Sequence, residues 1–350
     1  MNNNYCIIMA GGIGSRFWPW STETTPKQFL DILGTGKTLI RQTFERFVGL
    51  CPAENFYVVT NARYFDLVQE QIPELNPDQI LCEPVRRNTA PCIAYASYKI
   101  KGINPAANIV VTPADHVILK EEEFQRVIRL GLDHASQSND LITLGIEPTR
   151  PDTGYGYIEF QKSEGQEIHS VEQFREKPDL ENAKRFIEAG NFVWNSGVFI
   201  WNLQVILQAF ENYIPDLHEL FTGLESSLNT DNERTVISEQ FANSPDISID
   251  YGVMEKADQV KVIFGDFGWS DLGTWGSLFS ILDKDEQNNA SLGDQVHLSN
   301  STGCIVKGSG KRLVVTEGID DVIVVDTDDV LLICKKSDEQ KIKQLVAKLK

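Results

Sequence analysis

The chain has 350 residues, of which 41% are hydrophobic and 23% are charged, and its formal net charge is −18. This length suits one large α/β domain with a small appendage, or two medium domains. The acidic balance argues against a nucleic acid or an anionic membrane as a general partner, and no apolar run is long enough for a transmembrane helix. A phosphorylated small molecule stays compatible with this charge, because it needs only a local basic cluster.

The first 150 residues alternate apolar strands with amphipathic helices. The predicted strands are residues 5–10, 56–60, 108–116 and 141–146, and the predicted helices include residues 40–48, 61–72 and 121–135. This β-α-β-α order predicts a doubly wound sheet whose ligands bind outside the carboxyl ends of the strands. Residues 9–16 and 112–116 both lie at such ends, so we expect them to be neighbours in space.

The pattern changes twice further along the chain. Residues 151–275 contain glycine-punctuated strand segments, then a helical stretch from about Leu203. From about Asn289, short strand-like segments recur at intervals of roughly ten residues and end in a lysine-rich helix. We therefore predict a large domain over residues 1–285 and a small β-rich domain over residues 286–350. The Asp-Thr-Asp segment at residues 326–328 is expected to be a solvated turn and not a metal site.

The six cysteines are scattered without C-x-x-C spacing. Disulfides and a zinc site are therefore not expected, and buried free thiols in a reducing compartment fit better. The first twelve residues, MNNNYCIIMAGG, lack a basic region and a cleavage site of small residues, so no secretory signal is expected. Both observations favour a cytoplasmic location.

Two well-known phosphate-binding motifs fail in the glycine-rich segments. A dinucleotide fingerprint that starts at Gly12 and Gly14 meets Phe17 where its third glycine belongs. A P-loop that ends in GTGKT, residues 34–38, meets Asp31 at its first glycine position. Residues 34–38 are instead predicted to form a turn that leads into a helix.

What remains near the N-terminus is G-G-x-G-x-R followed by P-K-Q-F. Glycines let backbone N–H groups approach an anion closely, and such nests bind phosphate oxygens. Arg16 can contact a phosphate with two N–H groups, and Lys27 supplies a compact charge. Taken alone, this segment is equally compatible with an ordinary turn between a strand and a helix.

The chain resembles the sugar-nucleotidyltransferases, and in particular the bacterial mannose-1-phosphate guanylyltransferases, or GDP-mannose pyrophosphorylases. The segments that carry the resemblance follow the family's order: GGIGSRFWPWS, TPKQFL, EPVRRNTAP, VVTPADHVI, TGYGYIEF, FREKPD, NSGVFIWN, SIDYGVMEKA, FGWSDLGTW and GIDDVIVVDTDDVLLICKK. The family's usual R-L-W-P-L-S stands here as RFWPWS, an apolar exchange that concerns packing. The resemblance implies a Rossmann-like, glycosyltransferase-A-like nucleotidyltransferase domain with a small C-terminal domain like a left-handed β-helix.

The activity implied by the resemblance is transfer of GMP from GTP to mannose 1-phosphate, which gives GDP-mannose and pyrophosphate, with Mg²⁺ as cofactor. The sugar phosphate attacks the α-phosphorus of GTP in line, so the protein mainly positions substrates and stabilises charge. Longer bifunctional relatives add a cupin-type isomerase domain for which this chain ends too soon, so no phosphomannose isomerase activity is expected. The resemblance also suggests a homodimer.

The resemblance assigns the candidate residues to three groups. The expected nucleotide-binding residues are Ala10, Gly11, Gly12, Gly14, Glu83, Arg87, Asn88 and Thr89. The expected catalytic residues are Arg16 at the departing pyrophosphate, Lys27 at the phosphates, and Asp115 and Asp271 as ligands of Mg²⁺. The expected sugar-phosphate residues are Gly156, Glu176, Lys177 and Asn195. His116 is expected to be structural, because a phosphate nucleophile is already an anion and needs no base.

Two other functions stay open at this point. The chain could transfer a nucleotide to another sugar 1-phosphate, or use another nucleoside triphosphate. It could also be a catalytically silent homologue that binds a nucleotide sugar as a regulatory subunit. The joint presence of Arg16, Lys27, Asp115, Lys177 and Asp271 favours an active enzyme.

Overall fold

The structure is a computed structural model that describes residues 3–163 and 165–349. It contains two compact units, each discontinuous in sequence. The first consists of the chain up to Gly11, Thr43–Ala114 and Ile118–Trp269, and the second of Gly12–Gln42, Asp115–Val117 and the chain from Ser270 onward. The boundary expected between residues 285 and 286 stays a prediction. Three short elements contain residues of both units: α1 (Leu39–Phe47), β5 (Val117–Ile118) and β11 (Trp269–Ser270).

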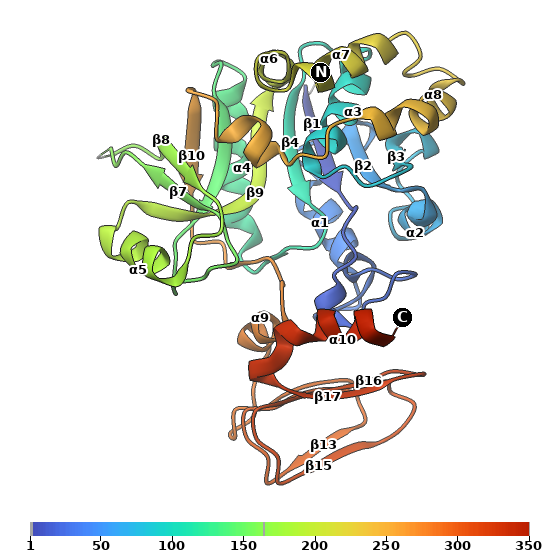
Figure 1. Cartoon of the computed structure of the whole chain (residues 1–350), viewed down its shortest axis with the longest axis vertical. Helices are drawn as coiled ribbons and strands as arrows, with labels where there is room; N and C mark the ends of the chain where they lie inside the picture. The colour runs from blue at the N-terminus through green and yellow to red at the C-terminus, as the bar shows by residue number, and fades with distance from the viewer. Residues whose placement is uncertain (1–2, 164, 350) are drawn as a thin grey trace. The chain divides into compact units, whose positions relative to one another are not determined.

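A nine-stranded sheet forms the centre of the first unit, in the order β3-β2-β1-β4-β9-β6-β10-β8-β7 (Figure 1). Its strands are β1 (Asn4–Met9), β2 (Phe56–Asn61), β3 (Ile80–Glu83), β4 (Asn108–Pro113), β6 (Leu141–Ile146), β7 (Tyr157–Phe160), β8 (Ile168–Arg175), β9 (Phe192–Asn202) and β10 (Val260–Phe264). The first four strands in this order are parallel, as predicted. β9 then runs antiparallel between β4 and β6, so the prediction of a doubly wound sheet is wrong beyond β4.

Helices cover both faces of this sheet. The helices of the first unit are α2 (Phe65–Gln71), α3 (Thr89–Lys101), α4 (Glu121–Ala135), α5 (Leu180–Ala189), α6 (Leu203–Tyr213), α7 (Pro215–Leu224) and α8 (Glu233–Gln240). Helices α3, α6 and α7 share one buried cluster with Phe199 and Trp201 of β9. Gly131 of α4 packs against Ile200, whose side chain points to the opposite face because successive strand residues alternate. The predicted helix at 121–135 and strand at 141–146 are confirmed as α4 and β6.

The parallel strands of the first unit end together at one edge. Met9 pairs with Val59 and with Pro113, and Asn61 pairs with Glu83. The N–H of Ala114 donates to the carbonyl oxygen of Met9 at 3.0 Å. We expected the segments that follow β1 and β4 to be neighbours. This is confirmed for the first residues of both segments.

The second unit holds a small β-rich coil. Strands β12 (Ala290–Leu292), β14 (Ile305–Lys307), β16 (Val322–Asp326) and β17 (Leu331–Lys335) form one sheet, and β13 (Val296–Ser299) and β15 (Val314–Glu317) form another. Ala290 lies beside Ile305, and Ile305 beside Ile323, in parallel register, as in successive coils of a β-helix. Helices α9 (Trp275–Ile281) and α10 (Ile342–Leu349) pack on these strands through Trp275 and Ile342. The predicted terminal helix is thus confirmed up to Leu349, and Lys350 lies outside the described residues.

The prediction of a solvated turn at residues 326–328 is wrong for Asp326. Asp326 is fully buried at the end of β16. Its carboxylate pairs with Arg312 at 2.5 Å and accepts a hydrogen bond from the Ser309 hydroxyl at 2.5 Å. The Arg312 guanidinium holds the pKa of Asp326 below its ordinary value. Asp326 therefore ties neighbouring coils together, and only Asp328, paired with Lys311, lies at the surface.

Two simpler expectations concern thiols and membranes. All six cysteines are free, and Cys6, Cys51, Cys92 and Cys304 are buried, as predicted. Within residues 3–163 and 165–349, no helix has the length and apolar character needed to cross a membrane.

Candidate active site

The glycine-rich loop of the second unit turns at Gly14. Its φ of 66° lies in the left-handed region, where a side chain is strained. A Cβ at this position would meet the Cβ of Lys27 at 2.5 Å, far inside normal contact. The third glycine of MAGGIG is therefore required for both the turn and the close approach of Lys27.

The loop directs its carbonyl oxygens to the protein and leaves its N–H groups unused. The carbonyl oxygen of Gly12 accepts from Gln28 Nε2 at 2.9 Å, and that of Ile13 accepts from the Ser21 hydroxyl at 2.6 Å. In the part of the chain that the structure describes, no acceptor takes the N–H groups of Gly12, Ile13 or Gly14. Successive free N–H groups around a left-handed turn form a concave site for an anion.

Lys27 is the centre of the polar cluster in the second unit. Its side chain is 4% exposed, and its ammonium forms an ion pair with Asp115 Oδ2 at 2.9 Å. It also donates to the carbonyl oxygens of Asp271 at 2.8 Å and Leu272 at 3.0 Å. The three N–H donors of the lysine are thus all used by protein acceptors. Lys27 thereby joins the segment after β4 to the loop before α9.

The four predicted catalytic residues lie around one cavity of about 260 Å³. Its lining residues are Gly14, Ser15, Arg16, Phe17, Lys27, Asp115, His116, Asp271, Leu272 and Gly273. Arg16 is exposed, and among the described residues its guanidinium makes no hydrogen bond or ion pair with another side chain or the backbone. An unengaged guanidinium beside free N–H groups is suited to a phosphate or pyrophosphate.

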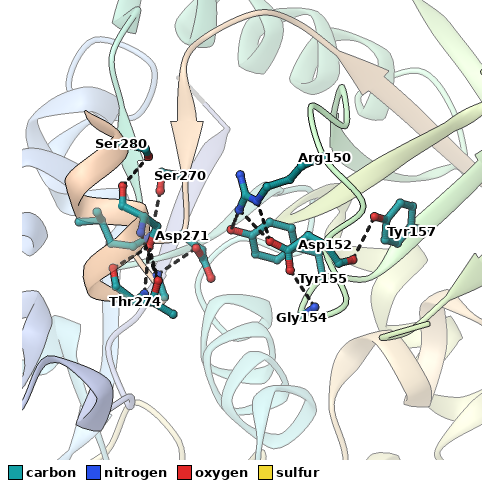
Figure 2. A network of polar contacts seen from close by, with 12 residues as sticks. Arg150, Asp152, Gly154, Tyr155, Tyr157, Ser270, Asp271, Thr274 and Ser280 are labelled. Carbon is teal, nitrogen blue, oxygen red and sulfur yellow. Dashed lines mark hydrogen bonds and ion pairs between the residues drawn. The ribbon is translucent and has the colours of Figure 1, made fainter. Parts of the chain in front are cut away.

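The loop that carries Asp271 is held in an unusual conformation. Leu272 is fully buried and has a φ of 45°, which is strained for a residue with a branched side chain. The N–H of Gly273 donates to Asp271 Oδ1 at 2.9 Å, and Thr274 caps α9 through the N–H of Ser277 at 3.1 Å. Figure 2 shows Asp271 and Thr274 in this turn. The buried leucine side chain and the contacts of Lys27 hold the strained backbone in place.

The two carboxylates fit the requirements of Mg²⁺. Partial burial opposes the ionisation of Asp115, but Lys27 and His116 outweigh it and hold its pKa below the ordinary value. Mg²⁺ binds one or two carboxylates together with substrate phosphates. Within the described ranges, no group of three or more His, Cys, Asp or Glu side chains is placed to hold a metal ion. Asp115 and Asp271 line one cavity, and two carboxylates are the protein donors that such an ion takes.

Glu83 is the distinctive group of the expected nucleotide-binding set in the first unit. Its side chain is buried at the end of β3, and a Cβ on Gly11 would stand 3.6 Å from its Oε2. The other carboxyl oxygen, Oε1, has no hydrogen-bond partner among the described residues. Burial raises the pKa of Glu83 to about 8, although Arg86 counteracts it. A buried, unsatisfied carboxyl group next to Gly11 is a strong candidate for a ligand contact.

The next predicted residues have clear structural contacts at the start of α3. Asn88 caps the helix by accepting from the N–H of Thr89 at 3.0 Å. The Thr89 hydroxyl accepts from the N–H of Ile249 at 2.9 Å, and Arg87 donates to the carbonyl oxygen of Ala242 at 2.6 Å. The predicted helix start is confirmed, and Thr89 ties it to the segment around residue 249.

The predicted sugar-phosphate residues lie together in the first unit. A Cβ on Gly156 would meet Glu176 Oε2 at 2.5 Å, so the carboxylate rests against this glycine. Lys177 forms an ion pair with Glu176 and adopts a left-handed φ of 46°. Its side chain is 62% exposed, which leaves the ammonium accessible to an anionic ligand.

Asp250 is a candidate site residue to which the sequence analysis gave no role. Asn195 donates through Nδ2 to Asp250 Oδ1 at 2.6 Å, and its Oδ1 accepts from Thr143 and from the N–H of Gly197 at 3.1 Å each. Asn195 is thus fixed by three contacts. Burial, and then the charge of Glu176, raise the pKa of Asp250 to about 6. The segment SIDYGVMEKA carried the resemblance, but no spacing in it singled out this aspartate.

Asp250→Asn is expected to stabilise the chain at neutral pH. An acid whose pKa is raised by folding contributes its full stability below the ordinary pKa of 3.8, and loses it as the pH rises through about 6. The amide does not titrate and can still accept from Asn195. Unfolding free energies measured at pH 4.5, 5.5 and 7 should therefore show a gain over wild type that grows with pH. The exposed Asp258→Asn serves as control, and a pH-independent difference would contradict the assignment.

Comparison with known protein families agrees with the fold. The family described as Nucleotidyl transferase matches residues 5–288, and the MannoseP isomerase/GMP-like beta-helix domain matches residues 293–349. The chain belongs to the nucleotidyl transferase family, and it is an enzyme of that class. The β-helix-like character predicted for the C-terminal segment is confirmed as well.

Individual relatives cover nearly the whole chain. Mannose-1-phosphate guanylyltransferase 2 of Escherichia coli O157:H7 is 38% identical, over 98% of this chain and 73% of the relative. The alginate biosynthesis protein AlgA of Pseudomonas syringae pv. tomato is also 38% identical, over 98% of this chain and 71% of the relative. A crystal structure described as mannose-1-phosphate geranyltransferase from Thermus thermophilus has a TM-score of 0.90 and 32% identity, and covers 99% of both chains. The resemblance stated from the sequence motifs is confirmed.

Proposed function

We propose that this chain transfers GMP from GTP to mannose 1-phosphate and releases GDP-mannose and pyrophosphate. The observation that carries the proposal is the match, over 98% of the chain, to a relative named mannose-1-phosphate guanylyltransferase. The cavity around Arg16, Lys27, Asp115 and Asp271 supports an active enzyme over a silent homologue, because these groups suit phosphoryl-type transfer.

The second unit supplies the groups for the phosphates. The free N–H groups of Gly12 to Gly14 hold the nucleotide phosphates, and Arg16 stabilises the departing pyrophosphate. Asp115 and Asp271 would hold Mg²⁺, which would neutralise charge on the phosphates. Because its three donors are already used, Lys27 acts by fixing Asp115 against the loop of Asp271. This role is more indirect than the phosphate contact expected from the sequence.

The first unit supplies the groups for the sugar phosphate. Lys177 attracts the phosphate of mannose 1-phosphate, and Glu176 accepts from sugar hydroxyls beside the backbone of Gly156. Asn195, held by Asp250, faces the same substrate. The nucleophile is a phosphate oxygen that is already anionic, so no general base is required. Positioning of the two substrates then supplies most of the catalysis.

Glu83→Gln is expected to lower kcat/KM for GTP about 10- to 100-fold and to weaken the preference for GTP over ATP. A carboxylate can accept from both the N1–H and the N2–H of guanine, whereas an amide offers one acceptor. Because burial raises the pKa of Glu83 to about 8, GTP binds with loss of a proton below that pH. The KM for GTP of the wild type should fall as pH rises from 6 to 8, and the variant should lack this fall. The exposed Glu70→Gln on α2 serves as control, and equal pH profiles in all three proteins would refute the role.

A substrate panel tests the proposed function directly. Pyrophosphate release is measured with the four common nucleoside triphosphates and with mannose, glucose and galactose 1-phosphates. The pair of GTP and mannose 1-phosphate should give the highest kcat/KM. A higher value with another pair would assign the chain to that reaction, and no release with any pair would favour the silent homologue.

Two further expectations accompany the proposal. The chain forms a homodimer and resides in the cytoplasm. Light scattering tests the first and cell fractionation the second.

A further inference from the structure

The loop between β6 and β7 begins and ends beside Trp194 of β9. Ile146, which precedes the loop, and Tyr157, which follows it, both pair with Trp194. The last loop residue is Gly156, and the N–H of Asn195 donates to its carbonyl oxygen at 2.8 Å. The conformation of the loop therefore decides where the backbone of Gly156 stands next to Asn195.

Arg150 contacts the aromatic rings of Tyr155, in the same loop, and of Trp194 on β9. Its guanidinium carbon lies 5.7 Å from the ring centre of Tyr155 and 5.3 Å from that of Trp194. The ring of Tyr155 meets Trp194 at 4.9 Å between centroids with an interplanar angle of 67°. Stacking of a guanidinium on two rings that pack against each other fixes the guanidinium plane.

Asp152 connects Arg150 by hydrogen bonds to the later part of the loop. Nε and Nη2 of Arg150 donate to Asp152 Oδ2 at 3.0 and 2.7 Å. The other carboxylate oxygen accepts from the N–H of Gly154 at 2.8 Å, and the carbonyl oxygen of Asp152 accepts from the Tyr157 hydroxyl at 3.0 Å. Figure 2 shows Arg150 and Asp152 at the centre of these contacts. One arginine thus orders the loop on both sides of Asp152.

We infer that Arg150 is a positioning residue for the sugar 1-phosphate, acting through Asp152 and the aromatic pair on the backbone of Gly156. The inference rests on the proposed function for the role of Gly156 and Asn195. Glu176 has little room beside Gly156, because a Cβ there would stand 2.5 Å from its Oε2. A small shift of the loop would therefore also move the carboxylate that faces the sugar. A displacement of about 1 Å can lower the rate of an enzyme by about 100-fold.

The test compares the KM for mannose 1-phosphate with the KM for GTP. In Arg150→Gln, the KM for mannose 1-phosphate should rise at least about tenfold, while the KM for GTP stays within about twofold. Arg150→Lys keeps the charge beside Asp152 but loses the planar guanidinium and its stacking. Its KM for mannose 1-phosphate should therefore lie between that of the wild type and that of Arg150→Gln. Asp152→Asn provides a third variant, should the glutamine variant fold poorly. Melting temperatures confirm that each protein is folded.

Arg126 offers a matched control on α4. It is 47% exposed, compared with 52% for Arg150, and it also makes two N–H contacts to one carboxylate, that of Glu123. Arg126→Gln should leave both KM values unchanged. Equal rises in the two KM values for the Arg150 variants, or no rise beyond that of Arg126→Gln, would overturn the inference.

The same experiment distinguishes this inference from the proposed function. If the wild type prefers another sugar 1-phosphate or another nucleotide, the proposed function fails, and the KM split is measured with the preferred pair. If no pair is turned over, the affinity for mannose 1-phosphate is measured by titration calorimetry. Equal affinities of wild type and Arg150→Gln would then overturn the positioning role, and a loss of at least about tenfold would support it.

Discussion

Asp271→Asn should lower kcat by about 100- to 1000-fold while GTP still binds. The carboxylate of Asp271 lines the same cavity as that of Asp115, and the amide removes its negative charge. The contact of Lys27 is to the carbonyl oxygen of Asp271, and an asparagine can still accept from the N–H of Gly273. The substitution therefore removes a ligand for Mg²⁺ and leaves the local fold in place.

Rate and binding are measured separately for this variant. Single-turnover kinetics over a range of Mg²⁺ concentrations give the rate of the chemical step, and titration calorimetry gives the affinity for GTP. Asp283→Asn is the control, because Asp283 belongs to the same unit and does not line the cavity. Near-normal Mg²⁺-dependent turnover by Asp271→Asn would contradict the two-carboxylate arrangement. A large loss of GTP affinity would show that Asp271 contributes mainly to ground-state binding.

Helices and strands could be predicted where the residue pattern within one segment is enough to specify them. The helix at 121–135 was predicted from its amphipathic spacing, and the strand at 141–146 from its apolar run. The partner of a strand has no such local signal. The long strand β9 enters antiparallel between β4 and β6, and nothing in residues 192–202 alone specifies these neighbours.

The candidate site shows the same division. Residue type made the segment of Gly14 and Arg16 a candidate phosphate-binding loop, because glycine and arginine have distinctive chemistry, but the segment alone was equally compatible with an ordinary turn. The meeting of Asp115 with the loop of Asp271 depends on the tertiary fold, and only the family resemblance indicated it. The burial of Asp326 was missed for the same reason, since its partner Arg312 belongs to a neighbouring coil.

The burial of Glu83 and Asp250 could not be predicted from the sequence. Both are acids whose pKa is raised by burial, to about 8 and about 6. Sequence shows that an acid is present but not whether water reaches it, and the unsatisfied oxygen of Glu83 is visible only in the structure. Such groups destabilise the free protein at neutral pH, and a ligand that satisfies them offsets this.

Lys27→Met should destabilise the chain by about 3–5 kcal/mol and lower kcat by at least about 100-fold. Methionine has a similar length, but it leaves the Asp115 carboxylate without its cation and two carbonyl oxygens without a donor. Lys311→Met is the control: Lys311 is 71% exposed and pairs with Asp328 at 2.5 Å at the surface. Loss of such an exposed pair should change stability by less than about 1 kcal/mol.

The pH dependence identifies the ion pair as the cause. Lys27 holds the pKa of Asp115 below 3.8, so the contribution of the pair is present above this pH and is lost as the pH falls through the folded-state pKa. The difference in unfolding free energy between wild type and Lys27→Met should therefore be largest near pH 7 and shrink below about pH 4. Adding Asp115→Asn to Lys27→Met removes the uncompensated charge, so the double variant should be more stable than the sum of the single changes implies. Additive losses, with no change between pH 7 and pH 4, would mean that Lys27 stabilises the chain by packing alone, and that the link from Asp115 to the loop of Asp271 is not electrostatic.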